Sequence, residues 1–247
     1  YVQYFLGLLN LYTIFLLFNR GLDHFKMLFF LVLCSGYSLH VFTFLREPFL
    51  FLLITFFVYF LFKNKFLLSL ILIALIGLSR VDALLYILPF WIIRLSIRFR
   101  FKHIYKIIFF SYLSLYWLIF FGPLSLYTEP YIRAFSLLND FESNNSLIQN
   151  TLNLITPSLY LPKILFQIQL IGVLYYIFKL KSNMDLYKTS IFIFLFTLIV
   201  LLTISNNYGW LLRMTSGMAL IFFLTETYFY DSNKQTNETQ NYFTRFK

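Results

Sequence analysis

Apolar residues fill most of this chain in long runs, and polar or charged residues collect in the short gaps between them. Several runs reach the roughly 17 to 20 residues that a helix needs to cross about 30 Å of hydrocarbon. We expect nine membrane-embedded segments: Val2 to Phe18, Met27 to Leu45, Pro48 to Phe62, Phe66 to Ser79, Ala83 to Ile93, Ile107 to Leu124, Ile164 to Leu180, Thr189 to Ile204 and Leu211 to Tyr230. The predicted fold is an all-α, polytopic membrane helix bundle with about nine transmembrane or half-membrane helices.

Two consecutive runs, Phe66 to Ser79 and Ala83 to Ile93, are each too short to span alone. They form either one long tilted helix or a hairpin of two half-helices. Cytoplasmic gaps collect Lys and Arg, and the hairpin places fifteen of the twenty basic residues in such gaps. A single helix would instead place Lys63 and Lys65 opposite the basic stretch from Arg94 to Lys106. We therefore favour the hairpin, which makes the N-terminus external and the C-terminus cytoplasmic.

Residues 1–230 are expected to form a single membrane domain, with 125–161 as an extracytoplasmic loop and 231–247 as a cytoplasmic tail. The loop is apolar and longer than most connections, which is typical of a lid or platform; its acidic residues are equally consistent with the polar face of a packed loop. The chain begins with an apolar helix at Tyr1. Either a signal peptide has been cleaved, or an N-terminal helix and loop are lacking from this chain.

The composition is 60% hydrophobic and 12% charged, with a mean hydropathy of +0.75, and it excludes an ordinary soluble domain. The net charge of +10 lies in the expected cytoplasmic gaps, so topology explains it and no nucleic-acid partner is expected. The stretch from Arg94 to Lys106 suits anionic head groups, as a topogenic signal or as a phosphate-binding surface. Cys34 is the single cysteine and His24, His40 and His103 lack ligand spacing, so we expect no metal and no cofactor.

The best functional clue is a set of charged residues at the expected outer ends of the helices. They are Arg46 and Glu47 before Pro48, Arg80 and Asp82 at the tip of the hairpin, and Arg213 just inside the last helix. Arg suits the binding of a diphosphate, because it is always charged and bonds two oxygens at once. Glu47 or Asp82 is the candidate catalytic base toward a sugar hydroxyl. In the structural alternative, Arg46 with Glu47 and Arg80 with Asp82 only neutralise each other, and His40 is a packing residue.

The same residues carry a resemblance to a known group. The first segment is Phe44-Leu45-Arg46-Glu47-Pro48, which is followed by an apolar helix and the Lys63-Asn64-Lys65 turn. After a second apolar helix comes the other segment, Leu78-Ser79-Arg80-Val81-Asp82-Ala83-Leu84-Leu85, and then Pro89. Residues 27 to 95 resemble the central part of bacterial GT-C type integral-membrane glycosyltransferases, and also the repeat-unit polymerases of the EpsG and Wzy kind. Arg213 more weakly resembles an arginine near the end of such proteins.

That resemblance implies transfer of a sugar or glycan from a polyprenyl-phosphate-linked donor at the outer face of the bacterial cytoplasmic membrane. In the glycosyltransferase branch a first outer loop carries the catalytic acid, and this chain has no such loop. Either that loop belongs to an N-terminal part that is lacking, or the polymerase branch fits better. The polymerase branch relies on arginines, which modestly favours it. The expected partners are membrane lipid and a lipid-linked sugar.

Two further interpretations stay open: a transporter or flippase for an amphipathic substrate without chemistry, and a structural or assembly subunit. An enzyme should bring Arg46, Arg80 and Arg213 together with a carboxylate within about 4 to 6 Å. A transporter should place polar groups near mid-membrane and break helices in two related halves.

Overall fold

The computed structural model describes residues 1–18, 22–43, 46–80, 83–99, 156, 160–204 and 208–245. All regular secondary structure in these ranges is helical, which confirms the expected all-α class. The expected segment Ile107 to Leu124 and most of the loop 125–161 lie outside them. The described helices are α1 (Val2–Phe18), α2 (His24–Leu33), α3 (Ser35–Thr43), α4 (Arg46–Phe62), α5 (Phe66–Ser79), α6 (Leu84–Phe99), α10 (Leu161–Lys179), α11 (Met184–Ile204) and α12 (Tyr208–Arg245), with a 3-10 turn η2 (Leu180–Ser182).

The expected continuous segment from Met27 to Leu45 is two helices, with α3 turned by 96° from α2. The break is at Cys34, whose backbone leaves the helical region at φ −101° and ψ 61°. Ser38 stabilises the turn, because its hydroxyl donates to the Leu31 carbonyl in α2. Hydropathy alone missed this break because the apolar run continues through it. The local signals were Ser35 and Gly36, which are poor helix formers.

Helices α5 and α6 form the expected hairpin. The indole Nε1 of Trp91 donates to the Ser69 hydroxyl at 2.9 Å, although 22 positions separate the two residues. In one straight helix, 22 positions would correspond to roughly 33 Å. At the tip, the Leu84 side chain packs close to Gly77. Helices α5 and α6 therefore lie against each other and do not continue as one straight helix.

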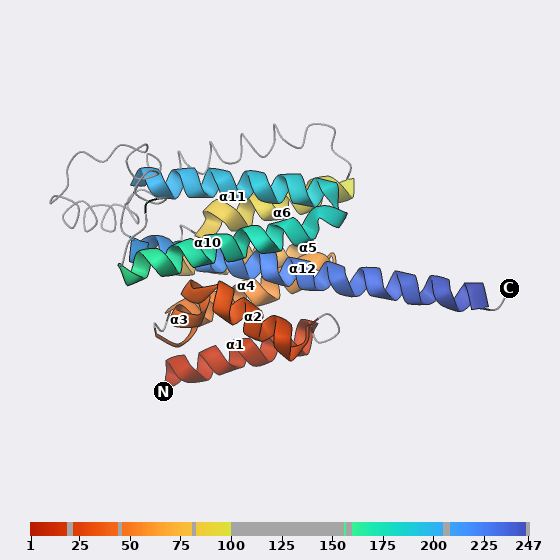
Figure 1. The fold of residues 1–247 in the computed structure, drawn as a ribbon, viewed down its shortest axis with the longest axis horizontal. Helices are drawn as coiled ribbons and strands as arrows, with labels where there is room; N and C mark the ends of the chain where they lie inside the picture. Colours follow the sequence, from red (N-terminus) through yellow and green to blue (C-terminus); the bar gives the residue numbers. More distant parts are fainter. Residues whose placement is uncertain are drawn as a thin grey trace.

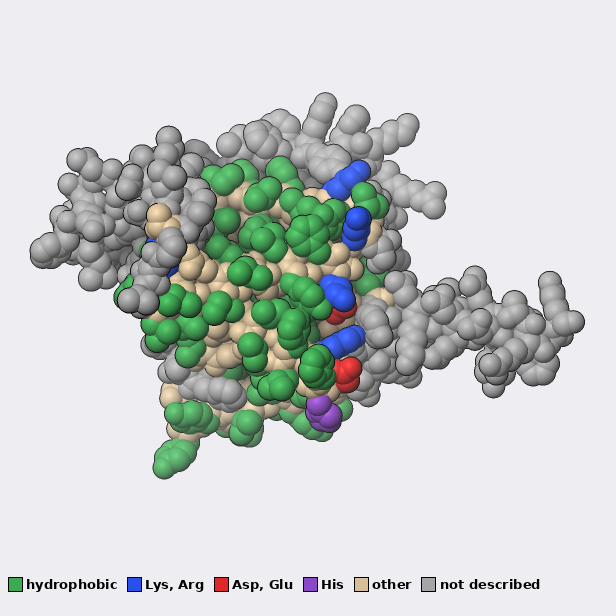
Figure 2. Space-filling view, viewed as in Figure 1, with side chains coloured by type: hydrophobic (Ala, Val, Ile, Leu, Met, Phe, Trp, Pro, Cys, Tyr) green, Lys and Arg blue, Asp and Glu red, His purple; other side chains and the backbone are tan. Residues whose placement is uncertain are grey.

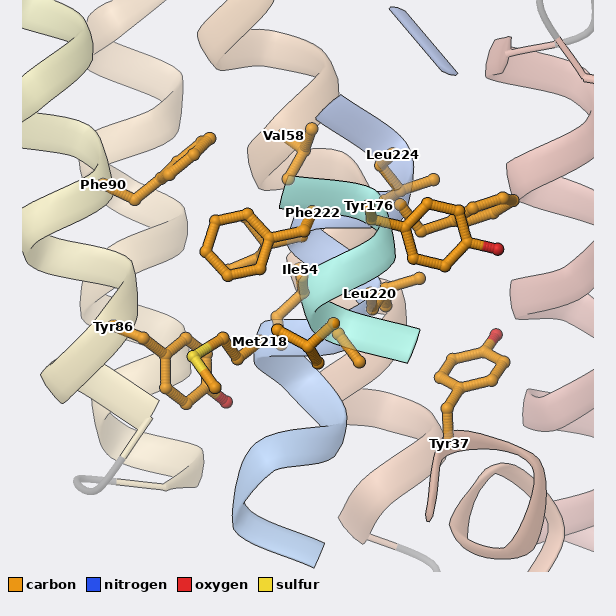
Figure 3. Close-up of a cluster of buried hydrophobic side chains, with 14 of the residues drawn as sticks. Tyr37, Ile54, Val58, Tyr86, Phe90, Tyr176, Met218, Leu220, Phe222 and Leu224 are labelled. Atoms are coloured by element: carbon orange, nitrogen blue, oxygen red, sulfur yellow. The ribbon is translucent and has the colours of Figure 1, made fainter. Parts of the chain in front are cut away.

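Helix α12 occupies the centre of the bundle, between α10 and α4 (Figure 1). Every residue from Met218 to Leu224 is at most 2% exposed, so this part of α12 is buried on all sides. Figure 3 shows its apolar side chains flanked by Tyr86 and Phe90 of α6, Tyr176 of α10 and Ile54 and Val58 of α4. A helix that is apolar all round is stable only in such a position or in lipid.

The outer surface is apolar over most of the face in Figure 2, and the charged side chains gather along the edge where α12 leaves the bundle. Lys26 of α2 and Lys179 of α10 both act electrostatically on Glu226 of α12. The Arg94 guanidinium lies 5.1 Å from the ring centre of Phe62, which immediately precedes Lys63. Phe62 also packs against Phe229 of α12, three positions after Glu226, so basic residues from four separate gaps lie at one end of the bundle, which we call the basic rim.

Helix α10 is the one described helix that is by itself long and apolar enough to cross a membrane, and the bent pair α2 and α3 passes the same test together. Over the described part of the chain, shorter apolar helical stretches of 10 to 17 residues lie in α1, α4, α5, α6 and α11. Helix α12 runs on to Arg245 through the expected tail, and Figure 1 shows it extending well past the other helices.

Candidate functional site

Glu47 is the centre of the site, and it is fully buried. It lies in the first turn of α4, where a carboxylate interacts favourably with the helix dipole. Pro48 is tolerated in that turn, since the first amides of a helix have no partner inside it. One carboxylate oxygen, Oε1, accepts hydrogen bonds from two arginines. The other, Oε2, is buried and accepts none from the described residues.

The first arginine, Arg80, comes from the end of α5. Its backbone is extended at φ −154° and ψ 105°, which terminates the helix, and its amide donates to the Ile76 carbonyl at 2.6 Å. Its Nη1 lies 2.8 Å from Oε1 of Glu47, and its side chain is only 8% exposed. Nη2 contacts the sulfur of Met214 in α12. Arg80 is thus held inside the bundle by α4 and α12 together.

The second arginine, Arg213, lies in the second turn of α12 and donates from Nε to the same Oε1. Its side chain is 32% exposed, in contrast to the buried Glu47 and Arg80. Arg213 therefore lies between the buried ion pair and the outside of the bundle. The three groups together carry a charge of +1, two guanidiniums and one carboxylate. Arg213 is the more exposed of the two arginines, so it is the one that an anion outside the bundle would reach first.

The cluster lies at the opposite end of the bundle from the basic rim. Arg213 and Glu226 are both on α12, thirteen positions apart, which corresponds to roughly 20 Å along the helix. Lys163 lies near the start of α12: it is 6% exposed, its Nζ is 5.5 Å from the ring centre of Tyr208, and it donates to the Thr156 hydroxyl at 3.0 Å. The end of the bundle with the arginines thus also holds a buried lysine.

The structure brings together three of the five expected site residues, Glu47, Arg80 and Arg213. Arg46 begins α4 immediately before Glu47, and its backbone alone is described. Asp82 lies outside the described residues. The expected pairing of Arg80 with Asp82 therefore stays a prediction, and the partner that the structure describes for Arg80 is Glu47, 33 positions away.

A second polar cluster, centred on Gln169 of α10, was missed by the sequence reasoning. Its Oε1 accepts from the Gly36 amide at 2.7 Å, and its Nε2 donates to the Leu212 carbonyl at 2.9 Å and to the Thr215 hydroxyl at 2.5 Å. Gln169 is fully buried and ties α3, α10 and α12 together beside Arg213. An amide within an apolar run was the available signal, because a buried polar group needs hydrogen-bond partners.

From the sequence we expected His40 only as a packing residue and did not predict its position near the charged cluster. It lies on α3, and it acts electrostatically on Glu47, Arg213 and Arg80. Its side chain is half-buried, and both ring nitrogens are shielded from solvent. The spacing of seven residues between His40 and Glu47 could be read from the sequence. What could not be read is that α3 and α4 place both beside arginines from distant segments.

Comparison with family models, with curated proteins and with solved structures finds no match to this chain. The arrangement of Glu47, Arg80 and Arg213 is therefore interpreted on its own geometry.

Proposed function

We propose that this protein is a polytopic membrane enzyme that transfers a sugar or a growing glycan from a polyprenyl-phosphate-linked donor. The contact of Arg80 and Arg213 with one buried carboxylate, Glu47, carries this proposal. The arginines would bind the phosphate groups of the donor, since guanidinium groups bond two phosphate oxygens at once. The proposal takes the resemblance to GT-C type glycosyltransferases and to EpsG- and Wzy-like polymerases as its guide to the substrate.

The distribution of exposed apolar residues supports the membrane part of this proposal. Helix α1 exposes Phe5, Leu8, Tyr12 and Leu16 at helical spacing, and each is more than half exposed. Helices α2 and α5 expose similar apolar faces, in Phe25, Leu28 and Val32 and in Leu67, Ile71 and Leu78. Water disfavours such a continuous apolar surface, whereas lipid tails solvate it. Helices that are apolar on the inner and the outer face are those of a membrane bundle.

The basic rim supports the proposed orientation. Lys26, Lys63, Arg94 and Lys179 would face the cytoplasm, as loops rich in Lys and Arg do. The arginine cluster would then lie toward the outer face of a bacterial cytoplasmic membrane. That is the side on which a lipid-linked sugar would be used.

Glu47 has two roles open to it in this mechanism. Its Oε1 orients both arginines, so it is a positioning residue for the phosphate-binding groups. Its second oxygen is an acceptor for a substrate hydroxyl, which keeps it a candidate base together with Asp82. Against the base role, a proton on Glu47 would leave the buried Arg80 without its counter-charge, which is costly in a low-dielectric interior.

The runner-up function is a transporter or flippase for the same kind of amphipathic substrate. The break between α2 and α3 favours it, because broken helices line the substrate sites of many transporters. The polar groups beside this break are explained without a substrate, since Gln169 satisfies the Gly36 amide and the Leu212 carbonyl. The break thus gives no separate evidence for a transport site, and the two arginines paired with Glu47 favour the enzyme.

The test is made in the source strain with the chromosomal gene deleted and complemented by variants. Arg80→Glu is expected to abolish the glycan product and to let the lipid-linked substrate accumulate, while the protein stays in the membrane. Lys181→Glu reverses a charge on an exposed residue of η2 and is the control, with product expected to stay normal. Normal glycan from Arg80→Glu would refute the phosphate-binding role. Accumulated substrate that crosses the membrane only with the wild type, with no bond broken, would select the transporter.

A further inference from the structure

Helices α2 and α10 lie side by side along a line that we call the α2/α10 seam. At its inner end Gly172 of α10 lies against the backbone of α2, since a Cβ on this glycine would be 2.8 Å from the Leu33 carbonyl oxygen. Nearer the basic rim, the rings of Phe29 and Tyr175 meet edge to face, with their centroids 5.2 Å apart. Where two aromatic side chains separate the helices, their backbones are further apart than where a glycine lets them touch.

The outer side of the seam is apolar on both helices. Helix α2 presents Phe25, Leu28 and Val32, and α10 presents Ile171 and Phe178; each of the five side chains is more than half exposed. Helix α2 has 10 residues before the break that separates it from α3, which corresponds to roughly 15 Å. That length is about half of a hydrocarbon layer of roughly 30 Å, or one leaflet. The exposed apolar surface therefore has the depth of one acyl chain of a phospholipid.

Three packed rings mark the level at which the charged residues begin. Phe30 of α2, Tyr176 of α10 and Phe223 of α12 contact one another, with centroids 4.0 to 6.0 Å apart. One turn nearer the basic rim, each of these three helices carries one charged residue: Lys26, Lys179 and Glu226. Because the rings hold the helices together, these charges lie at one level beside the seam.

The charges at this end of the seam are of both signs. Lys179 is exposed, and its ammonium lies 5.4 Å from the ring centre of Tyr175. Asp23 is exposed as well and caps α2, since its carboxylate accepts from the Lys26 amide at 2.6 Å. Together with the side chains of Lys26 and Glu226, two ammonium groups thus lie beside two carboxylates. Figure 2 shows basic and acidic side chains next to one another at this edge of the apolar face.

A zwitterionic amino phospholipid has the matching chemistry. Its head group carries one phosphate and one primary ammonium, and each forms charge-assisted hydrogen bonds with a group of opposite charge. An anionic phospholipid would meet two carboxylates and offer them no cation. A choline head group has a cation but no N–H to donate.

We propose that the α2/α10 seam binds one zwitterionic amino phospholipid of the cytoplasmic leaflet, with its phosphate at Lys179, its ammonium at Asp23 and one acyl chain along the exposed apolar side chains. Both head-group contacts are exposed, so a lipid reaches them from the bilayer. This inference uses the membrane setting and the orientation of the proposed function and none of its chemistry.

The experiment uses the full-length protein, purified in detergent and freed of lipid. It is titrated separately with dioleoylphosphatidylethanolamine, dioleoylphosphatidylglycerol and dioleoylphosphatidylcholine, and native mass spectrometry counts the lipids that it retains. The wild type is expected to retain one phosphatidylethanolamine, with an apparent affinity at least about fivefold above that for the other two lipids. Its melting temperature should rise with phosphatidylethanolamine, since a ligand of the folded state stabilises that state.

Two neutralising variants test the two head-group contacts separately. Lys179→Gln should lower the affinity for phosphatidylethanolamine about fivefold, and Lys179→Arg should restore it. Asp23→Asn keeps a good helix cap and should reduce the preference for phosphatidylethanolamine over phosphatidylcholine to less than about twofold. If Lys179→Gln does not fold, Lys179→Met replaces it, and Asp23→Asn tests the site independently.

Lys63→Gln is the matched control. The Lys63 ammonium lies 5.8 Å from the ring centre of Tyr59, the same arrangement as in Lys179 and Tyr175, but it follows α4 and is not part of the seam. Its neutralisation should leave the affinity for phosphatidylethanolamine within about twofold of wild type.

The outcomes that contradict the proposal are distinct. Tighter retention of phosphatidylglycerol than of phosphatidylethanolamine would overturn the charge matching, and equal retention of all three lipids would overturn the site. Equal weakening by Lys179→Gln and Lys63→Gln would mean that the whole rim attracts lipid, which also overturns it. A stable dimer that retains no lipid would assign the apolar face to a second copy of the chain.

Failure of the seam and failure of the proposed function are read from different measurements. Retention of phosphatidylethanolamine by a wild type that forms no glycan in the complemented strain refutes only the proposed function. Glycan formation by a wild type that retains no phosphatidylethanolamine overturns only the lipid site.

Discussion

Arg80 and Glu47 form a hydrogen-bonded ion pair of 2.8 Å between the end of α5 and the first turn of α4, both inside the bundle. Such a pair is energetically asymmetric. Forming it gains little over apolar packing, because both charges lose their water, whereas removing one partner leaves an uncompensated buried charge. The pair therefore specifies how α4 and the tip of the hairpin meet, and with Arg213 it links them to α12.

Glu47→Gln should destabilise the protein by about 3 to 5 kcal/mol, because it leaves the Arg80 guanidinium buried without a counter-charge. The double variant Glu47→Gln with Arg80→Met should recover part of this loss, with a coupling of about 0.5 to 3 kcal/mol. Thermal unfolding in detergent measures both. Asp23→Asn makes the same chemical change at an exposed helix cap, where it should cost about 0.5 kcal/mol or less. Additive effects of the two buried changes would mean that the pair does not form.

Gly36→Ala should cost about 1 to 3 kcal/mol, because its Cβ meets the Leu212 carbonyl, a backbone group that cannot rotate away. Gly77→Ala is the control. Its Cβ would lie 3.2 Å from the end of the flexible Leu84 side chain, so the same change in mid-helix should be neutral or stabilise by up to about 1 kcal/mol. Equal melting temperatures for both variants would argue against the close approach of α3 to α12.

The hairpin of α5 and α6 predicts a cross-link. Cysteines introduced at Ser69 and Trp91, in a Cys34→Ala background, should be joined within one molecule by a short bifunctional maleimide, because these side chains are in contact. Cysteines at Ser69 and Leu78 are the control: both are on α5, nine positions and roughly 14 Å apart, too far for the same reagent. A straight helix would give no cross-link in either variant.

The proposed orientation predicts the side from which single cysteines react. In a Cys34→Ala background, Tyr160→Cys should be labelled by an impermeant maleimide in intact spheroplasts, since Tyr160 is exposed before α10 at the end with the arginines. Lys181→Cys, exposed at the basic rim, should be labelled only after the membrane is opened. The reverse pattern would place the arginines on the cytoplasmic side, where the proposed chemistry has no substrate.

The sequence determined the all-α class, several of the helices and the pairing of α5 with α6. Hydropathy predicted α1 and α5 with the bounds that the structure has, and the distribution of Lys and Arg selected the hairpin that the contact of Trp91 with Ser69 demonstrates. It also singled out Arg80, Glu47 and Arg213, because charged residues at the ends of apolar runs are uncommon in such a sequence. These are local properties, which a chain expresses wherever its segments are finally placed.

Tertiary structure alone decided which of those charges meet. Glu47 is 33 positions from Arg80 and 166 from Arg213, and no periodicity relates such separations. The break at Cys34 depends on the same kind of information, since Gln169 of a distant helix satisfies the amide that the break exposes. Periodic patterns describe one helix at a time, whereas the ion pairs and the break depend on how helices pack, and packing is determined by side chains from the whole chain together.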